Sequence, residues 1–204
     1  LARLSAKSAA IVLDSGKEQQ LDVTGLDAFG NPKPIDPEFS VHPEKIGRVA
    51  GNGFRGEKAG TGTIVVRDGG IETEISVEVR TGALAEIGIR MPDGDIRAGK
   101  SYRFHAAGYD VSGNRVPLEA KWAATRHIGR IETETGMFHA GKAGDGMIAT
   151  YSKGITAYRN ITVNAGDLYS LFIHPNPVTV TAGGSREFSL QGVDIEDNRV
   201  AVSS

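Results

Sequence analysis

The heptapeptide GYDVSGN at residues 108–114 decides the fold, because closely similar stretches occur twice more in the chain. GLDAFGN occupies residues 25–31 and GVDIEDN occupies residues 192–198, so the copies begin 83 and then 84 residues apart. Each copy opens with a strand pattern and ends in residues typical of a turn. A nearly constant period of this size indicates tandem copies of one small domain.

The period divides the chain into two complete repeats and part of a third, which we place at residues 1–80, 81–165 and 166–204. Each complete repeat falls within the usual size range of a domain. The joints at residues 80–82 and 165–167 are short and lack the composition of a long flexible linker. We therefore expect neighbouring repeats to be arranged end to end, as a moderately stiff rod.

The strongest strand signal lies at residues 64–79, where apolar residues and Thr73 recur at alternate positions. They would share one face of a hairpin that turns at Asp68-Gly69-Gly70. The intervening positions are mostly charged or polar, with Arg67 and Glu74 among them. This alternation is typical of antiparallel strands with one wet face, and not of a parallel sheet. The pattern predicts an all-β fold of antiparallel sandwiches.

The second repeat keeps the character of the first at several separate places. Phe39 and Trp122 each come eight residues after the asparagine of the preceding turn. The stretch KAGTG at residues 58–62 returns as KAGDG at residues 142–146. Because turns, aromatic residues and alternating positions all match, we predict the same architecture for both repeats.

The third repeat stops at Ser204, before the counterpart of Trp122. Such a half domain lacks the partner sheet that would bury its apolar face. Three explanations stay open: the rest is present but disordered, residues 166–204 undergo strand-swapped self-association, or a protease cut the chain. Asp197 stands where the other copies have glycine, so the form of this turn also stays open.

The composition excludes several classes of function. With 23 basic and 25 acidic residues and no basic block, the chain is not expected to bind nucleic acid. It has no cysteine, which excludes disulfides and thiolate metal sites. No apolar run approaches the roughly 18 residues of a membrane span, so we predict no membrane insertion in this fragment. Because Leu1 begins inside an apparent first strand, we expect a piece of a longer protein.

These features resemble the bacterial immunoglobulin-like (Big-type) repeats of invasins, intimins, S-layer-associated proteins and accessory regions of cell-surface hydrolases. The resemblance is carried by G-x-D-x-x-G-N at residues 25–31 and 108–114, the aromatic residues Phe39 and Trp122, and A-G-x-G-x-I at residues 59–64 and 143–148. It implies tandem immunoglobulin-like sandwiches, with Trp122 in the strand-C tryptophan position. It also implies an extracellular or cell-surface location in a bacterium, and it is more specific for fold than for function.

The sequence shows no convincing catalytic or metal site, so we expect no enzyme activity and no cofactor. Glu132 and Glu134 are two residues apart and would share one strand face, as a carboxylate pair might. Glu72 and Glu74 do the same in the first repeat, and we interpret both pairs as solvated strand faces. The histidines never show a metal-binding spacing; they are His42, His105, His127, His139 and His174.

Two interpretations fit the aspartate of the repeated turn, which is Asp27, Asp110 or Asp194. Its carboxylate can close the turn by accepting backbone hydrogen bonds, which explains the residue fully. A calcium site would need several converging oxygen ligands, and the turns at Asp27 and Asp110 each offer only one carboxylate with a neighbouring amide or hydroxyl oxygen. We favour the closed turn and leave calcium binding open.

One difference between the repeats points to a ligand. Tyr151 and Tyr158 are expected on the outer face of the second repeat's last hairpin, where the first repeat has Arg67 and Glu74. Exposed aromatic rings can stack on sugars or anchor a protein, although tyrosine is also a good strand residue. A non-catalytic stalk that presents an adhesive or catalytic domain is the first hypothesis. The alternatives are a carbohydrate- or receptor-binding module, whose partner is cell-wall polysaccharide or another surface protein, and an accessory region of a surface glycosidase.

Overall fold

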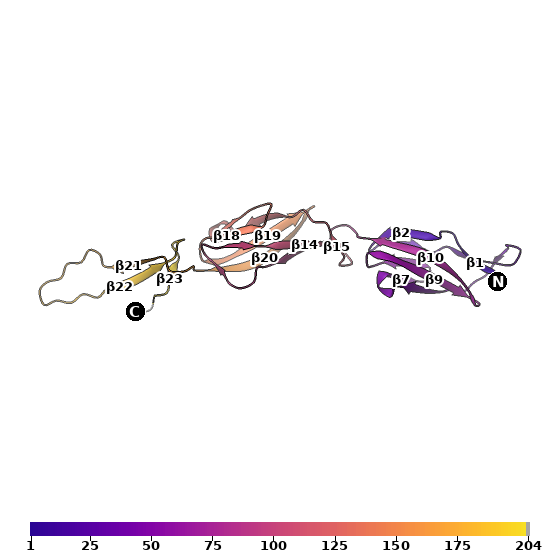
Figure 1. Ribbon diagram of the computed structural model, residues 1–204, viewed down its shortest axis with the longest axis horizontal. Coiled ribbons are helices and arrows are strands. Elements are labelled where there is room, and N and C mark those ends of the chain that lie inside the picture. Colours follow the sequence, from indigo (N-terminus) through magenta and orange to yellow (C-terminus); the bar gives the residue numbers. More distant parts are fainter. Residues whose placement is uncertain (203–204) are drawn as a thin grey trace. The chain divides into compact units, whose positions relative to one another are not determined.

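The computed structural model describes residues 1–202, which form strands and two short 3-10 turns (Figure 1). The chain divides into two compact units. The first contains Leu1–Glu86 and Ala107–Pro117, and the second contains Ile87–Ala106 and the described chain from Leu118 onward. The expected all-β fold is confirmed. The repeat boundaries predicted from the period, and the end-to-end arrangement, stay predictions.

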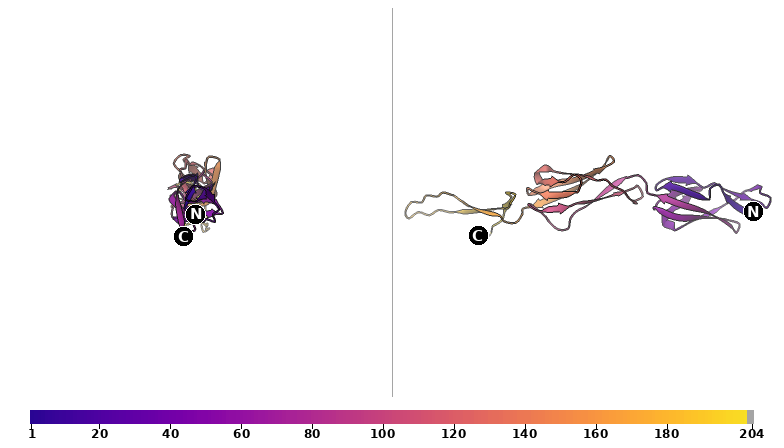
Figure 2. Two further views of the ribbon diagram at one scale, coloured as in Figure 1. Left: turned by 90° about the vertical axis from the view of Figure 1, so that its right-hand side faces the viewer. Right: turned by 45° about the horizontal axis from the view of Figure 1, so that its top comes forward.

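The first repeat folds into ten strands and one 3-10 turn. They are β1 (Arg3–Ala6), β2 (Ala10–Asp14), β3 (Glu18–Gln20), β4 (Val23–Leu26), β5 (Pro32–Lys33), β6 (Glu38–His42), η1 (Glu44–Ile46), β7 (Gly47–Ala50), β8 (Gly53–Gly56), β9 (Gly60–Asp68) and β10 (Ile71–Arg80). Sheet β2-β10-β9-β6 forms one layer, and sheets β1-β4-β5 and β3-β8-β7 form the other. Figure 2 gives two further views of the ribbon. Apolar side chains from both layers, among them Leu4, Phe54, Ile64 and Val77, make one buried cluster.

The β9–β10 hairpin confirms the expected register. Ile75 lies opposite Ile64 and Thr73 opposite Val66, and Gly69-Gly70 forms the two-residue turn. Because opposite residues share a face, the alternate apolar positions point into the core together. The sheet also holds one strand that alternation did not predict: β2 pairs with β10 in parallel. It does so because the chain changes sheet between β1 and β2, so it runs on in the same direction against a strand of the opposite layer.

The second and third repeats supply the remaining strands. They are β11 (Glu86–Arg90), β12 (Ile96–Arg97), β13 (Ser101–Arg103), β14 (His105–Tyr109), β15 (Arg115–Val116), β16 (Lys121–Ala124), η2 (Arg126–Ile128), β17 (Gly129–Ile131), β18 (Met137–Ala140), β19 (Gly144–Ser152), β20 (Ile155–Asn164), β21 (Ser170–His174), β22 (Ser189–Val193) and β23 (Arg199–Val200). The sheet orders β11-β14-β15, β12-β20-β19-β16 and β13-β18-β17 copy those of the first repeat, including the parallel pairing of β12 with β20. The repeat seen in the sequence is therefore a repeat of topology.

The core of the second unit is built around Trp122 on β16. Its ring centroid lies 6.4 Å from that of Phe104, which in turn meets Phe138 edge-on at 6.1 Å. Thr150 lies opposite Trp122, is fully buried and has a hydroxyl without a hydrogen-bond partner in the described structure. The position expected for an immunoglobulin strand-C tryptophan is thus occupied by a buried aromatic residue.

The described part of the third repeat forms a single sheet, β21-β22-β23, in the order of the sheet β1-β4-β5. Leu171, Phe172 and Ile173 of β21 are each about half exposed, at 50%, 48% and 51%. Among the described residues, no second sheet therefore covers these apolar side chains, as the sequence indicated. Strand-swapped self-association through residues 166–204 stays a prediction, as do disorder and proteolysis; Ser203 and Ser204 lie outside the described residues.

Candidate functional site

The Asp27 turn, residues Asp27–Asn31, shows how the repeated motif closes. The Asp27 carboxylate accepts backbone N–H bonds from Phe29 at 2.8 Å and Asn31 at 2.9 Å. The Asn31 side-chain amide also donates to it, at 3.1 Å. This confirms the closed-turn interpretation of the aspartate. Hydrogen bonds from Asn31, above all from its side chain, lower the Asp27 pKa.

The Asp110 turn, residues Asp110–Asn114, has the same internal bonds in a different setting. Ser112 N and Asn114 N each donate to Asp110 Oδ1 at 2.9 Å. Asp110 is 3% exposed and Asn114 is 8% exposed, whereas Asn31 is exposed. The turn comes from the second repeat of the sequence, yet it packs within the first unit. Its burial therefore depends on residues outside the turn.

Two outside donors converge on the second carboxylate oxygen of Asp110. The Ser15 hydroxyl donates to Oδ2 at 2.7 Å, and the Gly82 N–H donates to it at 2.9 Å. Burial alone would raise the Asp110 pKa, but hydrogen bonds from Ser15, Gly82 and Asn114 outweigh it and hold the pKa well below its usual range. A buried carboxylate with this many donors stays ionised at neutral pH.

The Asn114 side chain of the Asp110 turn binds the loop at residues 57–59 of the first repeat. Asn114 Nδ2 donates to the Glu57 carbonyl at 2.7 Å, and Ala59 N donates to Asn114 Oδ1 at 3.1 Å. Lys58 Nζ adds a bond to the Ser112 carbonyl at 3.2 Å. One asparagine thus satisfies both a donor and an acceptor of the loop, which fixes the two segments in register.

Val111, at the tip of the Asp110 turn, packs against a glycine of the first repeat. Gly16 has φ +81°, and a Cβ added there would lie 2.6 Å from Val111 Cγ2. Gly99 repeats this arrangement with φ +78° and a distance of 2.7 Å to Ile195 Cγ2. Only glycine fits the conformation and the close approach together.

The Asp194 turn, residues Asp194–Asn198, repeats the whole set of contacts within the second unit. Gly166 N donates to Asp194 Oδ2 at 2.6 Å, Asn198 Nδ2 donates to the Gly141 carbonyl at 3.1 Å, and Ala143 N donates to Asn198 Oδ1 at 2.8 Å. These partners are 28, 57 and 55 residues apart, the same separations as around Asp110. Lys142 also bonds the Glu196 carbonyl, as Lys58 bonds that of Ser112.

Two of the differences between the Asp194 turn and the Asp110 turn bear on hydrogen bonding and backbone conformation. Ala98 stands in the place of Ser15, so the hydroxyl donor is lost. Asp197 stands in the place of Gly113 and adopts φ +57°, a left-handed conformation that aspartate tolerates better than most residues. The turn left open by the sequence therefore has the same form. Burial raises and hydrogen bonds, first from Asn198, lower the pKa of Asp194, with a net lowering.

This arrangement suits the joining of chain segments and not the binding of a cation. Both oxygens of Asp110 face N–H or O–H donors, and those of Asp194 face N–H donors. A calcium ion would need several oxygens free to coordinate it. Among residues 1–202, no three histidine, aspartate or glutamate side chains are grouped to hold a metal ion.

Tyr151 and Tyr158 lie together on the outer face of sheet β12-β20-β19-β16. Tyr151 is opposite Thr156 and Tyr158 is opposite Ala149, so the two rings occupy diagonal positions on one face. They are 46% and 62% exposed. The structure thus brings the two predicted contact residues together, and their role in binding stays a prediction.

The first repeat has a charged face at the corresponding place. Arg67 pairs with Glu72 at 2.9 Å, and Glu74 is exposed on the same hairpin. Of the two complete repeats, only the second therefore has the aromatic pair.

The prediction that Glu132 and Glu134 share a strand face is wrong. Strand β17 ends at Ile131, and both residues lie in the turn that leads to Gly136. Glu132 contacts His139 at 3.2 Å, whereas Glu134 pairs with Lys121. Alternation fails here because a turn, and not an extended strand, follows Ile131.

His139 also contacts Ser101, so serine, histidine and glutamate form a short chain of hydrogen bonds. Ser101 Oγ lies 2.9 Å from His139 Nδ1, and His139 Nε2 lies 3.2 Å from Glu132 Oε1. The side chains of His139 on β18 and of Glu132 in the turn after β17 are each 40% exposed, at the surface beside sheet β13-β18-β17. A solvated surface of this kind does not supply the enclosed, preorganised donors on which acyl transfer depends.

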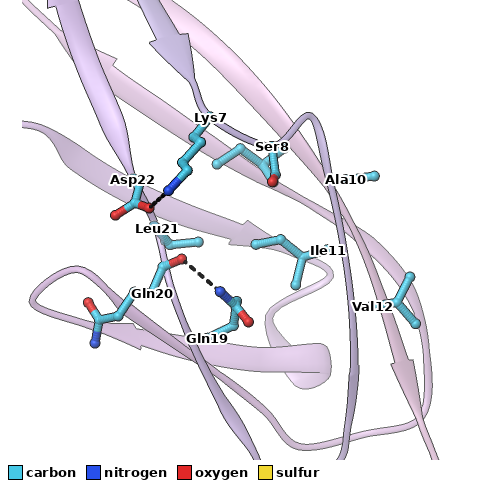
Figure 3. A pocket seen from close by; sticks show the side chains of 10 residues that line it. Lys7, Ser8, Ala10, Ile11, Val12, Gln19, Gln20, Leu21 and Asp22 are labelled. Carbon is cyan, nitrogen blue, oxygen red and sulfur yellow. Dashed lines mark hydrogen bonds and ion pairs between the residues drawn. The ribbon is translucent and has the colours of Figure 1, made fainter.

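A cavity of about 250 Å³ opens beside β2 and β3 in the first unit (Figure 3). Lys7 and Asp22 pair across its rim at 3.4 Å, with side chains 78% and 62% exposed. Gln19 donates to the Gln20 carbonyl at 3.4 Å. The charged groups lie mainly in solvent, so the cavity offers no buried polar side chain to a ligand.

Sequence reasoning recognised the turn but missed its partners. The missing signal was the joint repetition of two motifs: G-x-D-x-x-G-N and K-A-G recur together, with a nearly fixed separation. That separation places Lys58 54 residues before Ser112 and Lys142 54 residues before Glu196.

Comparison with known proteins finds no matching protein family and no matching curated protein. Solved structures do match, at low identity. The human cadherin fragment CDH23 EC21–23 is 9% identical over 79% of this chain and 63% of its own, with a TM-score of 0.49. Domains 1–6 of the surface layer protein SbsC are 15% identical over 97% of this chain, with a TM-score of 0.39. The chain spans 32% of the length of that structure.

A higher TM-score, 0.51, is found for FdeC, an adhesin of Escherichia coli. The match covers 96% of this chain and 74% of the adhesin structure, at 17% identity. No helix within residues 1–202 has the length and apolar character to cross a membrane. Membership of the Big-type family stays a prediction. At this identity the likeness shows the fold alone, which is that of immunoglobulin-like β-sandwich repeats.

Proposed function

We propose that the chain is a non-catalytic stalk segment of a bacterial cell-surface or secreted protein, which presents an adhesive or catalytic domain. One observation carries the proposal. In the second and third copies of the turn, the recurring aspartate and asparagine bind the turn of one repeat to loops of the repeat before it. Asp110 and Asn114 are buried in those contacts, so these two residues hold chain segments together and are not free to meet a substrate.

The proposed location rests on the fold and on the sequence resemblance. The matched FdeC structure is described as an adhesin, and the resemblance to Big-type repeats implies a surface or secreted protein. Because a shared fold hosts many functions, the role itself needs a direct test.

Distances between paired spin labels test the stalk function. The chain has no cysteine, so Glu74→Cys and Thr156→Cys give two unique labels at exposed positions of the two complete repeats. A stalk with fixed spacing gives a narrow distance distribution, and Asp110→Ala with Asn114→Ala broadens it. The matched control, Asp27→Ala with Asn31→Ala, removes the same residue types from the exposed turn and leaves the width unchanged.

Two results would count against the stalk function. One is a broad distribution in the parent chain. The other is a distribution that Asp110→Ala with Asn114→Ala leaves unchanged while circular dichroism shows both chains folded.

A carbohydrate- or receptor-binding role is the second candidate, and the exposed diagonal pair Tyr151 and Tyr158 favours it. Two rings on a flat face can stack on sugars or anchor a protein. Glycan arrays and cell-wall pulldown of the parent chain test it, together with Tyr151→Ala plus Tyr158→Ala. The counterpart substitutions Arg67→Ala plus Glu74→Ala serve as the control. No binding, or binding that survives loss of both tyrosines, removes this candidate.

A further inference from the structure

The Asp27 turn has the internal bonds of its two copies but none of their outside partners. Among residues 1–202, every hydrogen bond to the side chains of Asp27 and Asn31 comes from within the turn. The side chain of Asn31 is exposed, and Phe29 is 91% exposed. An amide that elsewhere holds both a carbonyl and an N–H group here faces solvent.

The outside partners of the filled turns stand at fixed positions in the sequence. The glycine N–H lies 28 residues before the aspartate, and the loop N–H and carbonyl lie 55 and 57 residues before the asparagine. Counted back from Asp27 and Asn31, all three positions fall ahead of Leu1. The partner that fits the exposed turn is thus defined by chemistry and by spacing.

We infer that the Asp27 turn is a docking site for the end of an immunoglobulin-like repeat of the same kind, joined directly ahead of Leu1. The inference deepens the proposed stalk function and rests on it. Such a repeat end offers a glycine N–H to Asp27, a loop N–H and carbonyl to Asn31, and a positive-φ glycine to the tip of the turn. Ala28 takes the place of Val111 and Ile195, and its smaller side chain leaves room at that glycine.

Phe29 adds a feature that the filled turns lack. It stands in the place of Ser112 and Glu196, whose carbonyls accept bonds from Lys58 and Lys142. A lysine of the docked repeat end would reach the Phe29 carbonyl with the aromatic ring beside it, where a cation and a ring attract each other.

The test is a chain in which residues 1–83 are duplicated directly ahead of Leu1, which restores all three spacings. The added copy carries Asn31→Ser, so that one Asn31 side-chain amide remains to be followed by NMR. Hydrogen exchange of that amide is expected to slow on the order of tenfold relative to the unextended chain, the factor that one ordinary hydrogen bond provides. The NMR-measured pKa of Asp27 is expected to fall further as it gains a donor.

A matched control separates docking from mere attachment. A flexible ten-residue Gly-Ser spacer between the added copy and Leu1 breaks the spacing of 28 residues, and the slowed exchange is expected to be lost. Unchanged exchange in the directly joined chain overturns the inference, and so does slowing that survives the spacer. Slowing that grows with concentration in the unextended chain overturns it in favour of docking between molecules. If the spin-label width responds to Asp110→Ala with Asn114→Ala while Asn31 exchange does not change, the inference fails and the stalk function stands.

Discussion

The first unit contains the same turn twice, once exposed at Asp27 and once buried at Asp110, and the pair separates two contributions. The internal bonds are almost identical: the aspartate accepts from two backbone N–H groups in both turns, at 2.8 and 2.9 Å around Asp27 and at 2.9 Å around Asp110. Only the Asp110 turn adds Ser15 and Gly82 as outside donors. The local sequence is therefore enough to form the turn. The residues packed around it determine whether the turn also binds another segment of the chain.

The largest expected effect is the contrast between Asp110→Ala and Asp27→Ala. Removing the Asp110 carboxylate leaves a buried hydroxyl and several N–H groups unpaired, so the free energy of unfolding of the first unit should fall by about 3 kcal/mol. Asp27→Ala exposes the freed N–H groups to water and should cost much less. Urea unfolding monitored on amide signals of the first unit measures both. Equal losses would break the comparison.

Acid should act mainly through the buried aspartates. The folded-state pKa of Asp110 is lowered, so its contribution to stability is complete above the unfolded-state pKa, near 3.9. It is lost as the pH falls from there toward the lower folded-state value, and a carboxylate of this kind contributes on the order of 2 kcal/mol. Urea midpoints between pH 5 and pH 2 should fall steeply for the parent chain and less for Asp110→Asn. Parallel slopes for the two would contradict this reading.

Ser15 and Ala98 occupy equivalent positions beside the two buried turns, so exchanging their side chains compares the surroundings of Asp110 and Asp194. Ser15→Ala removes one hydrogen bond to a carboxylate and should destabilise the first unit by about 1.5 kcal/mol. Ala98→Ser offers the missing donor to Asp194 and should stabilise the second unit by a smaller amount. The same unfolding measurement, followed on each unit separately, checks both. A loss for Ala98→Ser would show that the two surroundings differ in more than this side chain.

The smallest expected effect concerns Gly113 and Asp197. Asp197→Gly relieves a left-handed conformation and should stabilise the second unit by about 0.5 kcal/mol. Gly113→Ala places a Cβ at φ +72° and should destabilise the first unit by about 1 kcal/mol. Thermal unfolding of the two variants measures the shifts. Destabilisation by Asp197→Gly, or stabilisation by Gly113→Ala, would mean that side-chain contacts, and not backbone strain, govern this position.

The sequence predicted what depends on local pattern. Alternating apolar residues located the β9–β10 hairpin and its register, and the G-x-D-x-x-G-N motif located the closed turn. The parallel pairing of β2 was missed, because alternation reports which face is buried and not which neighbour a strand meets. Glu132 and Glu134 were misplaced because a turn interrupts the expected strand. The partners of Asp110 lie 28 and 95 residues away in the chain, beyond any local rule.

Each buried turn binds residues of the preceding period, and this constrains how such a chain can gain or lose length. Each period carries one aspartate–asparagine turn, together with the loop and the glycine that bind the turn of the next period. Unequal crossing-over that removes or inserts a whole period therefore leaves complementary halves at every new junction. Gain or loss of any other length would strand a buried carboxylate, so lengths should vary in whole periods.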